Sequence, residues 1–326
     1  MAKKEKFTSA EWVTFRPEIK VHDCTVRDGG LMNNHKFPDD FVRSVYQACV
    51  DAGVDYMEFG YRASKKIYKP EEYGPWKYCD EDDLRRIVGE NKTGLKISVM
   101  ADAERTDYRE EIIPKNQSVI DCIRVACYVH QIPTALDMVV DAHEKGYETT
   151  VNLMAVSTVP DFELGKALEV IAQSPANVVY IVDSYGSLYA EQIDDLVARF
   201  SAAMKGKKEI GIHAHNNQQL AFANTIAAII KGATRLDATL MGLGRGAGNC
   251  HLELLLSFLK NPRYLTRPIL KCIQETILQM RKEIDWGYSI PYAITGALNE
   301  HPRDAIKLRE SDRRDDYVAF FDEMND

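Results

Sequence analysis

Short runs of apolar and β-branched residues alternate with longer segments of helical spacing along most of the chain. Runs of this length predict buried strands, and apolar residues three and four positions apart predict amphipathic helices. The eight predicted strands are Ile19–Cys24, Tyr56–Gly60, Lys96–Ala101, Cys122–Cys127, Thr149–Ala155, Val178–Asp183, Glu209–His215 and Leu236–Met241. The helices predicted after them are Pro38–Ala52, Glu81–Glu90, Tyr108–Gln117, Thr134–Lys145, Pro160–Gln173, Ala190–Met204, Gln218–Lys231 and Asn249–Leu259.

Strict alternation of strands and helices predicts a parallel sheet, and eight such units over about 240 residues match a closed (β/α)₈ TIM barrel of the α/β class. An open, doubly wound sheet is the alternative, because alternation alone does not show that a sheet closes. We therefore expect an N-terminal arm over residues 1–18, a barrel over 19–265 and a short C-terminal helical extension over 266–326. Within the extension, the pattern predicts a helix over Ile269–Ile284.

One connection is much longer than the others. The segment Arg62–Cys79 follows the second predicted strand and contains four lysines and four large aromatic residues. Long loops at the carboxyl ends of barrel strands often act as lids or bind substrate, although a solvated surface loop is the plainer interpretation. The lysines suggest that a substrate bound there is anionic or large and polar.

The composition is that of an ordinary globular protein, with 45% hydrophobic and 28% charged residues among 326. A net charge of -8 argues against a nucleic-acid partner. The sequence contains no apolar run of the ~20 residues that span a bilayer, and no secretory signal follows the basic N-terminus. We therefore expect a cytoplasmic protein without a membrane partner. The seven cysteines include no C-x-x-C pair, so they predict buried thiols rather than disulfides or a zinc cage.

The seventh predicted strand ends in His213-Ala214-His215-Asn216. Side chains two apart on a strand point to the same side, so His213 and His215 project together at the mouth of the barrel. Two imidazoles in this arrangement form half of a divalent metal site. The alternative is a pair of hydrogen-bonded structural histidines.

Two further segments end at the same mouth. The first strand is followed by Arg27-Asp28-Gly29-Gly30, in which Asp28 suits a metal ligand and Arg27 supplies positive charge, unless the two form only a structural ion pair. The eighth strand is followed by the glycine-rich stretch from Gly242 to Asn249. Such a loop suits a carboxylate or phosphate better than a dinucleotide here, and Asn249 either caps the next helix or reaches the metal.

At these residues the sequence resembles the DRE-TIM metallolyases, the HMGL-like family, and within it the 4-hydroxy-2-oxovalerate aldolase branch most. The motifs are Asp23-x-Thr25-x-Arg27-Asp28-Gly29, His213-Ala214-His215-Asn216 and the loop Gly242–Asn249. The resemblance implies that Asp28, His213 and His215 bind the metal, and Asn249 stays open as an additional ligand. It also implies that Arg27 stabilises an enolate oxygen and that Tyr292, in a Gly-Tyr-x-x-x-Tyr segment, reaches the active site. The residues that we expect to contact substrate are Gly244, Arg245, Gly246, Tyr288, Glu58 and Arg124.

One departure from the aldolase pattern concerns the general base. Three residues after the metal aspartate, where the aldolases have a histidine, this chain has Leu31, whereas a second histidine of the pattern is present as His35. We therefore expect His35 to act as the base, with a water on the metal or Tyr292 as alternatives.

These residues predict a lyase that cleaves or forms the C3–C4 bond of a 4-hydroxy-2-oxo acid, giving pyruvate and an aldehyde. The expected cofactor is a divalent metal, Mn²⁺ before Mg²⁺, Co²⁺ or Zn²⁺. The alternatives are a Claisen-type enzyme that condenses an acyl-CoA with a 2-oxo acid, and a non-catalytic barrel subunit. We expect a homodimer. An aldehyde dehydrogenase partner is not expected, because the charged C-terminal tail is shorter than the docking extension of the bifunctional aldolases.

Overall fold

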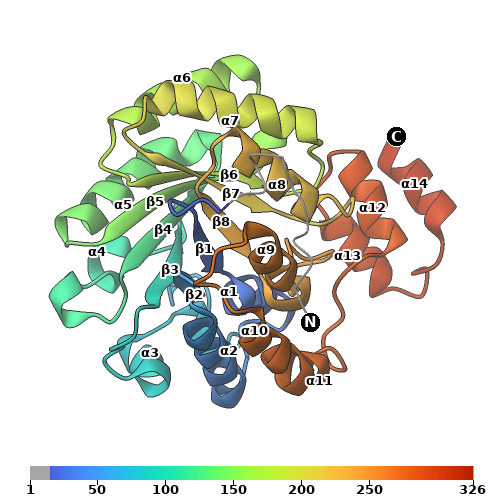
Figure 1. Cartoon of the computed structure of the whole chain (residues 1–326). Helices are drawn as coiled ribbons and strands as arrows, with labels where there is room; N and C mark the ends of the chain where they lie inside the picture. Colours follow the sequence, from blue (N-terminus) through green and yellow to red (C-terminus); the bar gives the residue numbers. More distant parts are fainter. Residues whose placement is uncertain (1–14, 326) are drawn as a thin grey trace, which may run out of the picture.

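Eight parallel strands close into a barrel in chain order, with β1 paired to both β2 and β8 (Figure 1). The computed structural model describes residues 15–325, so the predicted N-terminal arm lies mostly outside the described residues. The closed sheet confirms the (β/α)₈ prediction over the open-sheet alternative. The strands are β1 Lys20–Asp23, β2 Tyr56–Tyr61, β3 Lys96–Asp102, β4 Cys122–Cys127, β5 Glu148–Leu153, β6 Val178–Asp183, β7 Glu209–Ala214 and β8 Arg235–Ala238.

Helices cover the outside of the barrel and bury their apolar faces on it (Figure 1). They are α2 Asp39–Ala52, α3 Glu81–Val88, α4 Tyr108–Glu111, α5 Ile132–Glu144, α6 Asp161–Gln173, α7 Ala190–Met204, α8 Ala221–Lys231 and α9 Leu252–Leu259. Only α4 departs strongly from the predicted bounds. It makes a single turn because Pro114 lacks an N–H donor and disfavours helical geometry at the residue before it.

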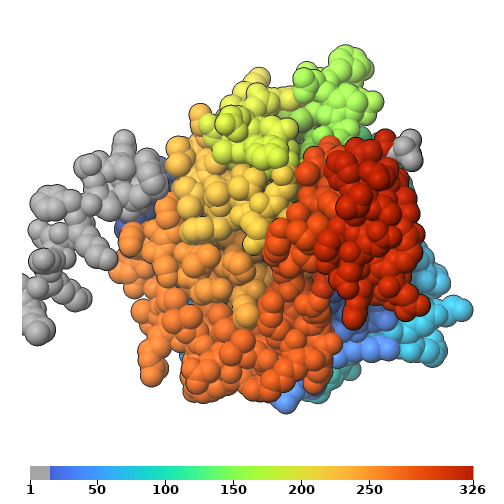
Figure 2. Space-filling model, turned by 90° about the vertical axis from the view of Figure 1, so that its right-hand side faces the viewer, coloured from blue at the N-terminus to red at the C-terminus, as the bar shows by residue number. Residues whose placement is uncertain are grey.

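The C-terminal extension has two parts. The first, α10 Thr266–Cys272 and α11 Leu278–Met280, packs against α2 and α9, and a π-helical segment, Ile273–Ile277, interrupts the single helix that the sequence predicts there. The second part comprises α12 Ile290–Ala297, α13 Arg303–Arg309 and α14 Tyr317–Asn325. These three helices form a block on one side of the barrel (Figure 2). Their small core includes Tyr292, Leu308 and Phe320, and it packs against Ala247 in the loop after β8.

The two ends of the long connection after β2 are buried against the barrel, whereas residues 65–72 between them are mostly exposed. Trp76 is fully buried, and its Nε1 donates a hydrogen bond of 2.8 Å to the carbonyl of Phe37. The connection also approaches β2 so closely that a Cβ atom on Gly60 would lie 1.8 Å from the carbonyl oxygen of Trp76. Strand β2 therefore fixes the position of this connection above the barrel. Among the described residues, no helix has the length and apolar character needed to cross a membrane.

This close approach generates a stability prediction. Gly60→Ala should lower the free energy of unfolding by about 1–3 kcal/mol, because the new methyl group overlaps a backbone carbonyl that cannot move freely. Gly165→Ala is the matched control, since Gly165 lies inside α6 with open space around it, and this change should stabilise the protein by about 0.5–1 kcal/mol. Denaturant unfolding measures both. Equal effects of the two substitutions would show that Gly60 makes no such contact.

Candidate metal centre

Three predicted ligands meet at the carboxyl-terminal mouth of the barrel. Asp28, His213 and His215 are all buried, and their ligating atoms lie within 4.8 Å of one another. Asp28 Oδ2 lies 3.7 Å from His215 Nε2, and the two imidazole rings lie 4.9 Å apart. The ends of the first and seventh strands therefore converge, as the motifs predict.

Asp28 lies just beyond β1 in a short helix, α1 Thr25–Gly29, and both Gly29 and Gly30 have helical backbone angles. These two glycines allow close packing. A Cβ atom on Gly30 would lie 2.1 Å from His35 Nδ1, and one on Gly29 would lie 2.9 Å from Leu243 Cγ.

Hydrogen bonds orient both imidazoles toward the shared space. The Nδ1 atom of His213 lies 2.9 Å from Asp237 Oδ2, and the Nδ1 atom of His215 lies 2.9 Å from the carbonyl oxygen of Asp183. In each ring this leaves Nε2 as the free nitrogen, and both Nε2 atoms are buried without a hydrogen-bond partner. Burial also lowers the pKa of His215 to about 3, so this imidazole is neutral at pH 7.

Asn249 completes the same group of atoms. Its Nδ2 donates to Asp28 Oδ2, and its Oδ1 is buried without a partner. Unpartnered buried acceptors are rare in folded proteins and call for an explanation such as a bound ion. A carboxylate, two oriented imidazoles and an amide oxygen are ligands that a divalent cation takes, so the residues present fit a metal.

A continuous chain of buried ion pairs, which ends in the hydrogen bond between Asp237 and the His213 imidazole, connects two of these ligands across the barrel interior. Its members, in order, are Asp28, Arg27, Glu58, Arg124, Asp237 and His213. The distances between the paired atoms are 2.6, 2.7, 2.9, 2.6 and 2.9 Å. The chain contains three carboxylates but only two guanidinium groups, so it carries excess negative charge. Such an excess is costly to bury alone and favours a bound cation.

Two of these residues were predicted to contact substrate, and the structure corrects this prediction. Glu58 and Arg124 point into the barrel interior from β2 and β4, are 0% exposed and do not line the cavity above. They hold Arg27 and Asp237 in place instead. Although burial opposes ionisation of Asp28, the guanidinium of Arg27 holds the pKa of this carboxyl well below its usual range.

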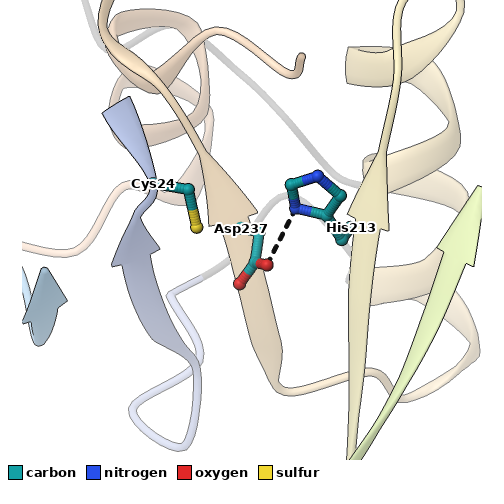
Figure 3. Close-up of side chains that lie close together, drawn as sticks. All are labelled: Cys24, His213 and Asp237. Atoms are coloured by element: carbon teal, nitrogen blue, oxygen red, sulfur yellow. Dashed lines mark hydrogen bonds and ion pairs between the residues drawn. The ribbon is translucent and has the colours of Figure 1, made fainter. Parts of the chain in front are cut away.

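Cys24, His213 and Asp237 form a second close group (Figure 3). In this group the carboxylate of Asp237 is already bound to His213 Nδ1 and to Arg124. Burial raises the pKa of the Cys24 thiol well above its ordinary value, so the sulfur stays protonated. We therefore interpret this group as the support that orients His213 rather than as another metal site.

A cavity of about 380 Å³ lies above the ligands, within the ~300–1,000 Å³ range of small-molecule sites. Arg27, His35 and Arg245, all predicted site residues, line it, and so does Leu31. Sequence reasoning missed several others. The motifs gave no signal for Asp102, Arg105, His301 and Arg303, which also line the cavity. His301 and Arg303 come from the C-terminal extension, whose path over the barrel mouth cannot be read from local patterns.

Besides Glu58, Arg124 and Asn249, four predicted residues lie outside the cavity lining: Gly244, Gly246, Tyr288 and Tyr292. Tyr292 is buried among the C-terminal helices, with Arg309 5.0 Å from its ring, and Gly246 packs against the other side of the ring. The predicted catalytic role of Tyr292 is thereby corrected to a structural one. Tyr288 is 58% exposed on the surface. Gly244 lies against Asp28 and Asn249, where a Cβ atom would overlap both side chains.

Comparisons with known proteins agree with this fold and site. The HMGL-like family matches residues 18–276. Oxaloacetate decarboxylase of Mycobacterium tuberculosis is 32% identical over 249 residues, which cover 75% of this chain and 71% of that protein. The 4-hydroxy-2-oxovalerate aldolase of Pelotomaculum thermopropionicum is 30% identical over 250 residues, covering 76% and 72%.

Two solved structures share the architecture. The N-terminal domain of a Bacteroides vulgatus protein provisionally assigned as an aldolase superposes with a TM-score of 0.76 at 27% identity, covering 92% of this chain and 100% of that one. The carboxyl transferase domain of Rhizobium etli pyruvate carboxylase has a TM-score of 0.68 at 12% identity, covering 92% of this chain and 55% of that one, which shows the fold alone. This chain is thus a (β/α)₈ barrel enzyme of the lyase class. It belongs to the HMGL-like family.

The role of Asp237 is testable by metal binding. Asp237→Asn should weaken Mn²⁺ or Co²⁺ binding about 10–100-fold, because the residue that orients His213 loses its charge. The matched control is Cys24→Ala, which removes the neighbouring thiol but leaves the Asp237–His213 contact intact and should bind metal normally. Isothermal titration calorimetry on folded, metal-stripped protein gives both affinities. Unchanged affinity in Asp237→Asn would show that His213 needs no such support.

Proposed function

We propose that this protein is a divalent-metal-dependent aldolase that cleaves or forms the C3–C4 bond of a 4-hydroxy-2-oxo acid. The single observation that carries the proposal is the placement of Arg27 beside three ligand side chains that line the same cavity. The relatives named above act through carbon–carbon bond cleavage next to a keto acid, which supports the same class of substrate here.

Asp28, His213 and His215 would hold the cation, with the Oδ1 atom of Asn249 as a further donor. When bound, a divalent cation supplies Lewis-acid charge that polarises the oxygens of a 2-oxo acid. Among the four metals compatible with mixed nitrogen and oxygen ligands, we propose Mn²⁺.

Arg27 is positioned to stabilise negative charge on the substrate. Its Nη1 binds Asp28 and its Nε binds Glu58, at 2.6 and 2.7 Å, so the guanidinium plane is fixed before substrate arrives. The remaining nitrogen, Nη2, has no hydrogen bond to the described residues, and Arg27 lines the cavity. A fixed donor aimed at the oxygen where charge develops is the kind of interaction that contributes most to catalysis.

His35 is the proposed general base. It lines the cavity, and burial together with the charge of Lys77 lowers its pKa well below the ordinary histidine value. The imidazole is therefore neutral at pH 7 and able to accept the proton of the C4 hydroxyl as the C3–C4 bond breaks. The structure offers no comparable role to Tyr292, which lies outside the cavity.

A second candidate reaction is decarboxylation of a 2-oxo acid that carries a carboxylate on C3. It would leave the same enolate beside Arg27, but loss of carbon dioxide requires no base. The observation that favours it is Leu31, an apolar side chain that lines the cavity at the position where the aldolase pattern has a histidine.

The metal and Arg27 assignments are tested by deuterium exchange into the methyl group of pyruvate. Exchange should require added metal, should vanish in Asp28→Ala and His213→Ala, and should fall about 10²–10³-fold in Arg27→Met, because the fixed donor to the enolate is lost. His130→Ala, which changes an exposed histidine, is the control and should exchange normally. Wild-type exchange rates in Asp28→Ala would refute the metal site.

The two candidate reactions are separated by His35→Asn. Asparagine tolerates the positive φ of 59° at this position, so the variant should fold. Cleavage of a 4-hydroxy-2-oxo acid should slow about 10²–10⁴-fold because its base is removed, whereas decarboxylation of oxaloacetate should proceed at the parent rate. Coupled pyruvate assays measure both. Equal losses in the two reactions would contradict the assignment of His35 as a base.

A further inference from the structure

The cavity contains far more positive charge than the metal centre uses. Besides Arg27, four cations line it, and we call them the cationic wall: Lys77, Arg105, Arg245 and Arg303. None of them forms an ion pair with a carboxylate of the described residues. The lining contains only two carboxylates, and one of them, Asp28, is bound to Arg27. Asp102 is therefore the one carboxylate of the lining that remains for the four cations, and of these Lys77 and Arg105 act on it electrostatically.

Lys77 shows how strongly this charge is held in place. It is only 5% exposed, and its ammonium lies over the rings of Tyr68 and Tyr61 at 4.0 and 4.3 Å. The nearby Lys65 and Lys66 instead pair with Asp80 and Asp107 at the surface. Burying an unpaired cation is unfavourable, and contacts with aromatic faces offset only part of that cost. An anion-binding site in the cavity explains why Lys77 is buried without a carboxylate partner.

Arg105 extends the same arrangement. Its Nη1 lies 3.3 Å from the hydroxyl of Tyr68, so Tyr68 contacts both cations, through its ring face and its oxygen. On the C-terminal side, Arg245 donates to the carbonyl of Ser184 at 2.8 Å, and its Nε is buried without a partner. Cations without a carboxylate partner therefore line the cavity from two separate parts of the chain.

A 2-oxo acid alone does not account for this charge. It brings a single carboxylate, and Arg27 with the metal ligands already offers that end of the substrate a binding site. We propose that the aldehyde half of the substrate carries a second anionic group, a phosphate or a carboxylate, which binds the cationic wall through Lys77 and Arg105. This inference rests on the proposed aldolase function and narrows its substrate class.

The experiment compares matched aldehydes in aldol addition to pyruvate by the metal-loaded enzyme. Glyceraldehyde 3-phosphate is paired with glyceraldehyde, and succinic semialdehyde with butanal. In at least one pair the charged aldehyde should have the higher kcat/KM, by about 10–100-fold, as expected for one or two charge-assisted hydrogen bonds. The pair with the larger preference distinguishes phosphate from carboxylate.

Substitutions test whether the cationic wall causes the preference for the charged aldehyde. Lys77→Met and Arg105→Gln should each remove most of the preference for the charged aldehyde, mainly through its KM. Any effect of the Lys77 change on His35 applies equally to both aldehydes of a pair. Lys65→Met is the matched control, because Lys65 lies in the same connection but pairs with Asp80 outside the cavity, and it should keep the preference.

The preference should also depend on pH. Burial lowers the pKa of Lys77 to about 8. The carboxylate of Asp102 opposes this shift, and the charge of Arg105 adds to it. The rings of Tyr61, Tyr68 and Tyr73 face the ammonium. A lysine is charged below its pKa, so the preference should be full near pH 7 and decline as the pH rises through about 8. In Lys77→Met this decline should be absent.

The outcomes separate the two proposals. Two outcomes overturn the anion site while the proposed aldolase function stands: aldehydes react without a preference for the charged member of either pair, or the preference survives both Lys77→Met and Arg105→Gln. Two other outcomes overturn the proposed function and the anion site with it: no aldehyde reacts, or pyruvate exchange does not depend on metal.

Discussion

The buried chain of ion pairs from Asp28 to His213 is the constraint on which the rest of the site depends. It draws members from β2, β4, β7 and β8 and from α1, so a shift of any of these elements would leave a charge unpaired in the barrel interior. Breaking such a pair costs about 3–5 kcal/mol, which makes the arrangement rigid. The same chain holds Arg27 in place and orients His213 toward the candidate metal centre. One network therefore supports both side chains.

Above this rigid floor, parts of the cavity wall come from segments outside the barrel strands. The connection after β2 brings Lys77, and the C-terminal helices bring His301 and Arg303. Under the proposed function, the floor would bind the 2-oxo acid and the walls would bind the other half of the substrate.

The sequence predicted most accurately the features that depend on local spacing, namely the strands and the ligands at their ends. All eight strands were predicted because their apolar runs are continuous, and the His213-x-His215 spacing placed two ligands on one side of a strand. Residues that act over long sequence distances were not recoverable in this way. Glu58 and Arg124 were expected at the substrate but bind Arg27 and Asp237, and Tyr292 was expected in the cavity but packs under Arg309. Their contacts depend on tertiary packing that no local pattern encodes.

The most direct measurement is the anomalous scattering of crystals loaded with Co²⁺ or Mn²⁺. The central claim, that buried ion pairs present three side chains to one cation, predicts a single strong peak within about 2.0–2.3 Å of a carboxylate oxygen of Asp28 and of the Nε2 atoms of His213 and His215. A peak elsewhere, or fully loaded crystals with no peak among these three residues, would contradict it.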